Sequence, residues 1–106
     1  MNNFEGYKTV KVPIGGNMRT LYVADDQEKR VKGLSEIRYM PRNMGMLFTY
    51  DEPVCNAFTM EKTNIPLRII FIDEDFNVVK SVLAEAGQKE EVRPESDFKY
   101  VIELPV

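Results

Sequence analysis

The chain has 106 residues, of which 43% are apolar and 29% are charged, and its formal net charge is −3. This length allows one compact domain with its own core, and the composition is globular rather than disordered. The chain contains no histidine, which excludes histidine-based acid–base catalysis, histidine-activated nucleophiles and histidine-ligated metals. Its one cysteine, Cys55, excludes an internal disulfide and a cysteine cage for a metal. We therefore expect no metal and no cofactor.

Residues 1–6 contain neither a basic segment nor an apolar run, so we expect no signal peptide and no membrane association. We accordingly expect a soluble, cytoplasmic protein. The negative net charge argues against nucleic-acid binding, because such affinity comes largely from neutralising phosphates. A local basic cluster is present and consists of Lys29, Arg30, Lys32, Arg38 and Arg42. Solvated charge on a helix and a loop explains this cluster more simply than a nucleic-acid site.

Residues 9–14 and 19–23 alternate apolar and polar side chains, and Gly-Gly-Asn at 15–17 lies between them. This pattern predicts a β-hairpin with a tight turn. Pro13 cannot donate a hydrogen bond to a neighbouring strand, so the first strand is expected at an edge of the sheet.

A short helix is predicted next. Asp25 suits the N-cap position and Glu28 follows three residues later, which is the spacing of a capping box. Gly33 suits the left-handed residue that ends a helix. Residues 35–43 then read as a loop or a single turn.

The rest of the chain predicts strands separated by polar turns. The expected segments are an apolar stretch at 46–48 ending in a turn at 51–53, a strand at 54–60, a central strand at 67–72, and strands at 78–83 and 98–104. The acidic segment 85–97 predicts a mobile or partner-facing loop. These elements predict a single, mostly β domain over residues 1–106, with one or two short helices, folded as a β-sandwich or a partly closed β-barrel.

Three blocks of sequence carry a family resemblance. Residues 30–34 read Arg-Val-Lys-Gly-Leu, residues 45–48 read Gly-Met-Leu-Phe, and residues 58–69 read Phe-Thr-Met-Glu-Lys-Thr-Asn-Ile-Pro-Leu-Arg-Ile. In this order and spacing, the chain resembles the domain of unknown function 192 over about residues 20–104. The resemblance implies a compact, mostly β fold, and it implies no reaction because the family has no assigned activity.

Several polar positions depart from the family pattern. The family's Trp, Lys, Asn and Asp are replaced by Thr59, Glu61, Lys62 and Arg68, and its Arg is replaced by Ile37 with Arg38 adjacent. Glu61 and Arg68 both carry the opposite charge from the family's residues. We therefore expect a reversed ion pair between them, across the turn that separates them.

The densest polar cluster beside the predicted buried strands is the candidate ligand site. Its members are Arg38, Glu61, Lys62, Thr63 and Arg68. Lys62 and Arg68 would attract an anionic or carbonyl-bearing small molecule, and Thr63 would donate a hydrogen bond. Arg68 strengthens this interpretation, because an arginine buried within an apolar strand requires a partner. The alternative is an exposed turn followed by an arginine whose stem packs along the sheet.

Three weaker candidates each have a simple structural explanation. The acidic residues 73–75 suggest calcium, but a polar hairpin turn needs no ion. Asp51 and Glu52 form a carboxylate pair, although a turn before Pro53 accounts for them. Cys55 is expected as a small core residue.

Two classes of function remain open. The first is a binding or accessory module that takes a protein partner or a small ligand, such as an anion. The second is a small enzyme acting on an anionic or sugar-like substrate through carboxylate, lysine and arginine side chains. The lack of histidine and of a nucleophile motif favours the binding module.

Overall fold

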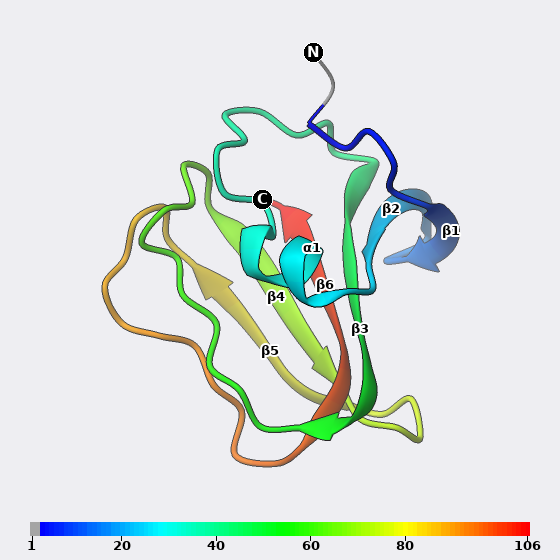
Figure 1. The fold of residues 1–106 in the computed structure, drawn as a ribbon. Helices are drawn as coiled ribbons and strands as arrows, with labels where there is room; N and C mark the ends of the chain where they lie inside the picture. The colour runs from blue at the N-terminus through cyan, green and yellow to red at the C-terminus, as the bar shows by residue number, and fades with distance from the viewer. Residues whose placement is uncertain (1–2) are drawn as a thin grey trace.

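The computed structural model describes residues 3–106, in which six strands form one mixed sheet and one short helix lies against it (Figure 1). The strand order is β1-β2-β3-β6-β4-β5, and the sheet does not close into a barrel. The elements are β1 (Thr9–Ile14), β2 (Asn17–Ala24), α1 (Gln27–Lys32), β3 (Met44–Val54), β4 (Leu67–Ile72), β5 (Val78–Ala84) and β6 (Phe98–Pro105). The predicted mostly β fold with a short helix is therefore confirmed.

The N-terminal hairpin forms as predicted. β1 and β2 pair in antiparallel register, with Ile14 opposite Asn17. Gly15 and Gly16 make the two-residue turn with φ of 62° and 83°, values that favour glycine. β1 lies at the edge of the sheet, where Pro13 leaves no ladder hydrogen bond unmade.

The helix begins one residue later than the sequence predicted. Asp26, and not Asp25, is the N-cap, and its carboxylate accepts a hydrogen bond from the Lys29 N–H at 2.8 Å. Two adjacent aspartates offer the same cap, so the residue type alone does not distinguish them. Gly33 ends the helix with a φ of 50°, as predicted.

Two predictions after residue 48 are wrong. The expected turn at 51–53 lies inside β3, which continues to Val54 with a register irregularity against β6 that accommodates Pro53. The expected strand at 54–60 is absent, apart from an isolated bridge between Phe58 and Val92. The chain leaves the sheet there because β6, and not the next segment, occupies the place beside β3. The central position of β4 is confirmed, since it lies between β6 and β5.

Strand direction explains how the site is built. β2 and β3 are parallel, and β3 and β4 both run antiparallel to β6, so β2, β3 and β4 all run the same way. Parallel strands require crossover connections. Residues 25–43, which include α1, make the first crossover, and residues 55–66 make the second. Both cover the same side of the sheet, here called the inner face (Figure 1).

The two faces of the sheet are packed differently. On β4, the inner face carries the buried Leu67, Ile69 and Phe71, while Arg68 alternates with them toward the outer face. The main core lies on the inner face, where side chains of both crossovers join those of the sheet. The outer face holds a smaller buried cluster of Leu21, Ile102 and Leu104.

The acidic segment 85–97 forms no strand, as predicted, but it is anchored to the second crossover. The N–H of Phe58 donates to the Val92 carbonyl at 2.7 Å, and the N–H of Val92 donates back at 2.8 Å. Val92 and Pro94 are buried, so this segment covers part of the core. No helix within residues 3–106 has the length and apolar character needed to cross a membrane.

Candidate functional site

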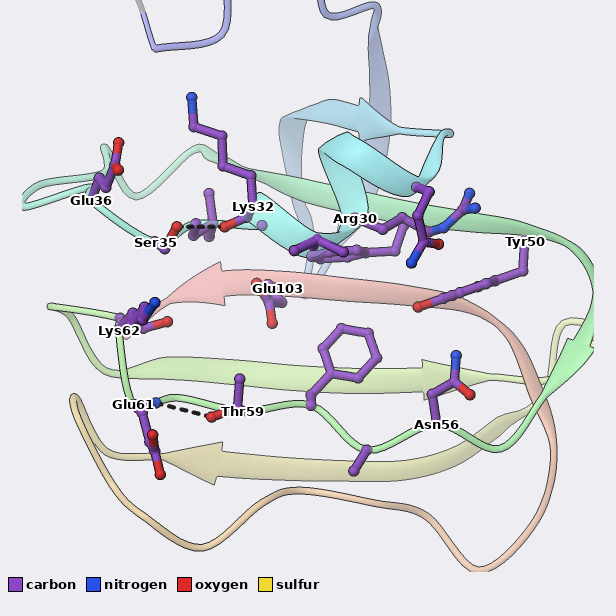
Figure 2. A pocket seen from close by; sticks show the side chains of 18 residues that line it. Arg30, Lys32, Ser35, Glu36, Tyr50, Asn56, Thr59, Glu61, Lys62 and Glu103 are labelled. Atoms are coloured by element: carbon purple, nitrogen blue, oxygen red, sulfur yellow. Dashed lines mark hydrogen bonds between the residues drawn. The ribbon is translucent and has the colours of Figure 1, made fainter.

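A groove of about 590 Å³ runs between the two crossovers on the inner face of the sheet (Figure 2). This volume is within the range of small-molecule binding sites. Residues 27–36 line one side and residues 56–63 line the other. Side chains of β3 and β6 complete the lining, so each side belongs to one crossover and the central strands lie between them.

Glu103 of β6 is the buried carboxyl of the groove. Its side chain lies between α1 and the second crossover in Figure 2, and the residue is only 5% exposed. Its direct cross-strand neighbours are Met46 on β3 and Ile69 on β4, both fully buried and apolar. Within residues 3–106, no side chain or backbone group makes a hydrogen bond or ion pair with this carboxyl.

The protonation state of Glu103 follows from this environment. Burial raises the pKa of Glu103 to about 8, because an ionised carboxylate is poorly stabilised among apolar neighbours. The side chain is therefore mostly neutral at pH 7. A neutral carboxylic acid carries an O–H group that can donate a hydrogen bond, and the described part of the chain supplies no acceptor for it.

Arg30 of α1 lies at one end of the groove. Its Nη1 donates to the Thr49 carbonyl at 2.8 Å, and its guanidinium lies 4.9 Å from the centre of the Tyr50 ring. The Nε atom is buried and has no hydrogen-bond partner among the described residues. Burial raises the pKa of the Tyr50 hydroxyl, and the charge of Arg30 opposes that rise. Arg30 is thus held in place while part of its donor capacity remains unused.

Glu61 and Lys62 lie toward the opposite end of the groove in Figure 2, on the second crossover. The Thr59 hydroxyl accepts a hydrogen bond from the Glu61 N–H at 3.2 Å, which shapes the turn. Thr63 is buried, and its N–H donates to the Met60 carbonyl at 3.0 Å. The exposed Lys62 therefore extends from a turn that is fixed on both sides.

Comparison with known proteins places the chain in a family. The model of DUF192, the domain of unknown function 192, described as an uncharacterized ACR, matches residues 10–106. The chain belongs to this family. The resemblance seen in the sequence blocks is confirmed, and the match also includes the N-terminal hairpin. None of the curated proteins matches the chain significantly.

Two solved structures share the DUF192 chain's fold. A protein of unknown function from Novosphingobium aromaticivorans has a TM-score of 0.80 and 24% identity, over 93% of this chain and 73% of that one. A protein from Sinorhizobium meliloti, described as "a putative transcription regulator", has a TM-score of 0.77 and 26% identity, over 94% of this chain and 80% of that one. The first likeness shows the fold and carries no activity.

The structure brings together three of the five predicted site residues of this DUF192 member. Glu61, Lys62 and Thr63 line the groove, whereas Arg38 and Arg68 do not. Arg38 is exposed on the loop after α1. Arg68 lies on the outer face of β4, where its Nη1 donates to the Ser81 hydroxyl at 2.9 Å. The side-chain alternation of β4 explains this result, because its inner positions are apolar.

The predicted ion pair between Glu61 and Arg68 is not formed. Glu61 lines the groove on the inner face, while Arg68 faces outward, and within residues 3–106 no ion pair joins them. The charge reversal relative to the DUF192 pattern is therefore not explained by a direct contact between these side chains.

Sequence reasoning missed Glu103, Arg30 and Tyr50. Glu103 was missed because it stands between Ile102 and Leu104, and a strand with one buried face would turn these apolar residues inward and Glu103 outward. β6 is in fact flanked on both sides by strands and buried on both faces near its end. The available signal was a single acidic residue within the apolar run of residues 101–104.

The weaker candidates have structural roles. An Asp73 carboxylate oxygen accepts the N–H groups of Asp75 and Asn77 at 3.0 and 2.9 Å, which makes the predicted turn. Among the described residues, no group of three or more Asp, Glu or Cys side chains is placed to hold a metal ion. Cys55 is exposed, contrary to its expected core position, because the segment that contains it is not a strand.

Proposed function

We propose that this protein is a binding module and that the groove takes a small organic ligand carrying an anionic group. The observation that carries the proposal is Glu103, a buried carboxyl that has no partner among residues 3–106 and lies beside a groove of ligand size. The carboxyl oxygens of Glu103 line the groove, so a ligand atom placed there can form a hydrogen bond with them.

The charges around the groove support an anionic ligand. Arg30, Lys32 and Lys62 line it, opposed by the carboxylates of Glu36 and Glu61. With Glu103 neutral, one positive charge remains in excess, although the whole chain carries a net charge of −3. A local positive excess on an acidic protein attracts anions to that place.

A fragment library containing anions, neutral molecules and cations tests this proposal. We expect anions to raise the melting temperature, and their amide chemical shift changes to fall on residues 30–36, 56–63 and 103. Lys62→Ala should weaken the anions about two- to fivefold, because an exposed charge pair contributes up to about 1 kcal/mol. Lys89→Ala, which removes an exposed lysine outside the groove, is the matched control. Hits that map elsewhere, or a set of cationic hits, would contradict the proposal.

An enzyme acting on an anionic or sugar-like substrate is the second candidate. The raised pKa of Glu103 favours it, because a carboxyl that stays protonated near neutral pH can serve as a general acid. Proton NMR of each bound compound over time separates the two functions. Turnover that Glu103→Gln abolishes would establish the enzyme, whereas unchanged ligand spectra favour the binding module.

Two further expectations from the sequence accompany the proposal. We propose that the protein works in the cytoplasm, where reducing conditions suit an exposed single thiol such as Cys55. We also propose that it binds neither nucleic acid nor membrane. The Sinorhizobium meliloti protein is described as a transcription regulator, whereas the net charge of −3 opposes a DNA-binding role for this chain. A protein partner remains an alternative to a small ligand.

A further inference from the structure

We propose that protonated Glu103 donates a hydrogen bond to a carboxylate of the ligand, so that the groove selects carboxylates attached to a small apolar body. This inference rests on the proposed function. It adds the chemical class of the ligand and assigns a hydrogen-bonding role to the proton of the Glu103 carboxyl group.

The first support is the kind of polar group that the protein leaves unpaired at the groove. The Glu103 O–H has no acceptor among residues 3–106, and the guanidinium of Arg30 has a protein acceptor only at Nη1. Arg30 can only donate hydrogen bonds, and protonated Glu103 can donate one through its O–H, so a ligand acceptor is the group that suits both of them. A carboxylate is the strongest acceptor of this kind, and bonds from a carboxylic acid to an oxyanion are among the shortest in proteins.

The second support is the apolar surface around these donors. Leu34, Ala57 and Phe58 line the groove together with Phe48 and Val31. The Phe58 ring is partly exposed and packs edge-to-face on Phe48 at 5.2 Å between centroids, which holds it rigidly. A small apolar body attached to the carboxylate would bury this surface.

Other ligand charges fit the groove less well. A cation would face a groove with one positive charge in excess, and a bond to an ionised Glu103 would require that charge between Met46 and Ile69, where burial disfavours it. A neutral amide would bond to Glu103 but would leave the one excess positive charge at the groove without a counter-charge.

The groups that face Glu103 determine the pH dependence. The titratable and charged residues around the groove are Arg30 and Lys32 from α1, Glu36 from the following loop, Tyr50 from β3, and Glu61 and Lys62 from the second crossover. The flanking positions on β3 and β4 are the uncharged Met46 and Ile69. Burial has the largest effect on the Glu103 pKa and raises it to about 8, so the side chain stays mostly protonated up to that pH. Carboxylate affinity should be constant below that pH and fall about tenfold per pH unit above it, with the protonated fraction.

The test uses benzoate, benzamide and benzamidine as an anion, a neutral molecule and a cation of nearly the same shape. Their affinities are measured by NMR titration between about pH 6 and about pH 9.5, while the 13Cδ signal of Glu103 reports its own protonation. We expect benzoate to bind most tightly and to lose affinity above the pH at which the Glu103 signal titrates. Bound benzoate should move that titration to higher pH.

Glu103→Gln keeps the shape and a hydrogen-bond donor, and it should bind benzoate with an affinity that no longer falls above pH 8. Glu103→Leu removes the donor and should lose benzoate binding. Glu91→Gln, an exposed carboxyl outside the groove, is the matched control and should keep the wild-type pH profile.

The possible outcomes distinguish the inferred role of Glu103 in selecting carboxylates from the proposed anion-binding function on which it rests. Benzoate binding with the same pH profile in wild type and Glu103→Gln would overturn the inference and leave the anion-binding function standing. If benzamide bound more tightly than benzoate, the claim that the groove selects carboxylates would be overturned, and the anion-binding function would not. Tighter binding of benzamidine, or no anion binding in the full fragment library, would overturn both.

Discussion

Arg68 on β4 and Glu103 on β6 are both ionisable residues within apolar strands that lie side by side, yet they face opposite sides of the sheet. Ile69 is the direct partner of Glu103, and Arg68 pairs with Leu104, so the two ionisable residues are one position out of phase. Arg68 faces outward and reaches the Ser81 hydroxyl. Glu103 faces inward and has no partner among residues 3–106. An ionisable residue within an apolar strand thus indicates a site only when the alternation of the strand places its side chain on a covered face of the sheet.

The largest expected effect comes from removing the ionisable carboxyl group of Glu103. The folded pKa of about 8 lies above the unfolded value near 4.5, so the folded protein holds a proton that the unfolded chain releases. The free energy of unfolding should therefore decrease by about 1.4 kcal/mol per pH unit from pH 4.5 to about 8. Glu103→Gln should remove this decrease and be more stable than wild type by roughly 4–5 kcal/mol above that range.

Urea unfolding of wild type, Glu103→Gln and Glu91→Gln at a series of pH values measures this difference. Glu91→Gln should follow the wild type, because this carboxyl is exposed. If Glu103→Gln and wild type keep parallel profiles, Glu103 is not buried as an unpartnered acid, and the contrast with Arg68 disappears.

Gly45→Ala tests how tightly the outer face is packed. A Cβ at Gly45 would lie 2.5 Å from the Glu103 carbonyl oxygen and 2.9 Å from Leu104 Cδ2. The backbone of β6 cannot shift without disturbing its pairing on both sides, so we expect a loss of about 2–3 kcal/mol in unfolding free energy. Chemical denaturation measures it, and a change below about 0.5 kcal/mol would show that the outer face has more freedom than its contacts indicate.

Asp26→Ala tests the segment that holds Arg30 over the inner face. Losing the N-cap should lower the melting temperature by roughly 4–8 °C. Asp25→Ala is the matched control and should change it little, since the structure places the cap at Asp26. Equal effects of the two substitutions, measured by thermal unfolding, would show that both aspartates share the cap.

Arg68→Ala should have the smallest effect. This side chain is partly exposed and has one side-chain hydrogen bond, so we expect a loss of at most about 1 kcal/mol in unfolding free energy. Benzoate affinity should not change, because Arg68 does not line the groove. An affinity loss as large as that of Lys62→Ala would remove the functional distinction between the two faces.

Much of the fold could be predicted because local signals determine it. The Gly-Gly turn, the proline at the edge strand, the end of the helix at Gly33 and the apolar β4 each follow from the residues present. The turn at 51–53 and the strand at 54–60 were wrong because strand pairing with distant segments determines where β3 ends and where the chain leaves the sheet.

The candidate site could be predicted only in part. The polar turn at 61–63 was identified from its composition, and it does line the groove. Glu103 was missed because its orientation depends on β6 being inserted between β3 and β4, which no local pattern indicates. Arg68 was included because its apolar neighbours suggested burial, whereas the outer face of β4 leaves it partly exposed.

The insertion of β6 between β3 and β4 also has a consequence for folding kinetics. Both sides of the groove precede β6 in the chain, so the strand that carries Glu103 becomes available after the crossovers that will cover it. Pairing β6 with β3 closes a long loop, and such non-local contacts slow folding. The groove is therefore complete only once this strand has docked. A ligand that needs the complete groove should slow unfolding without speeding folding.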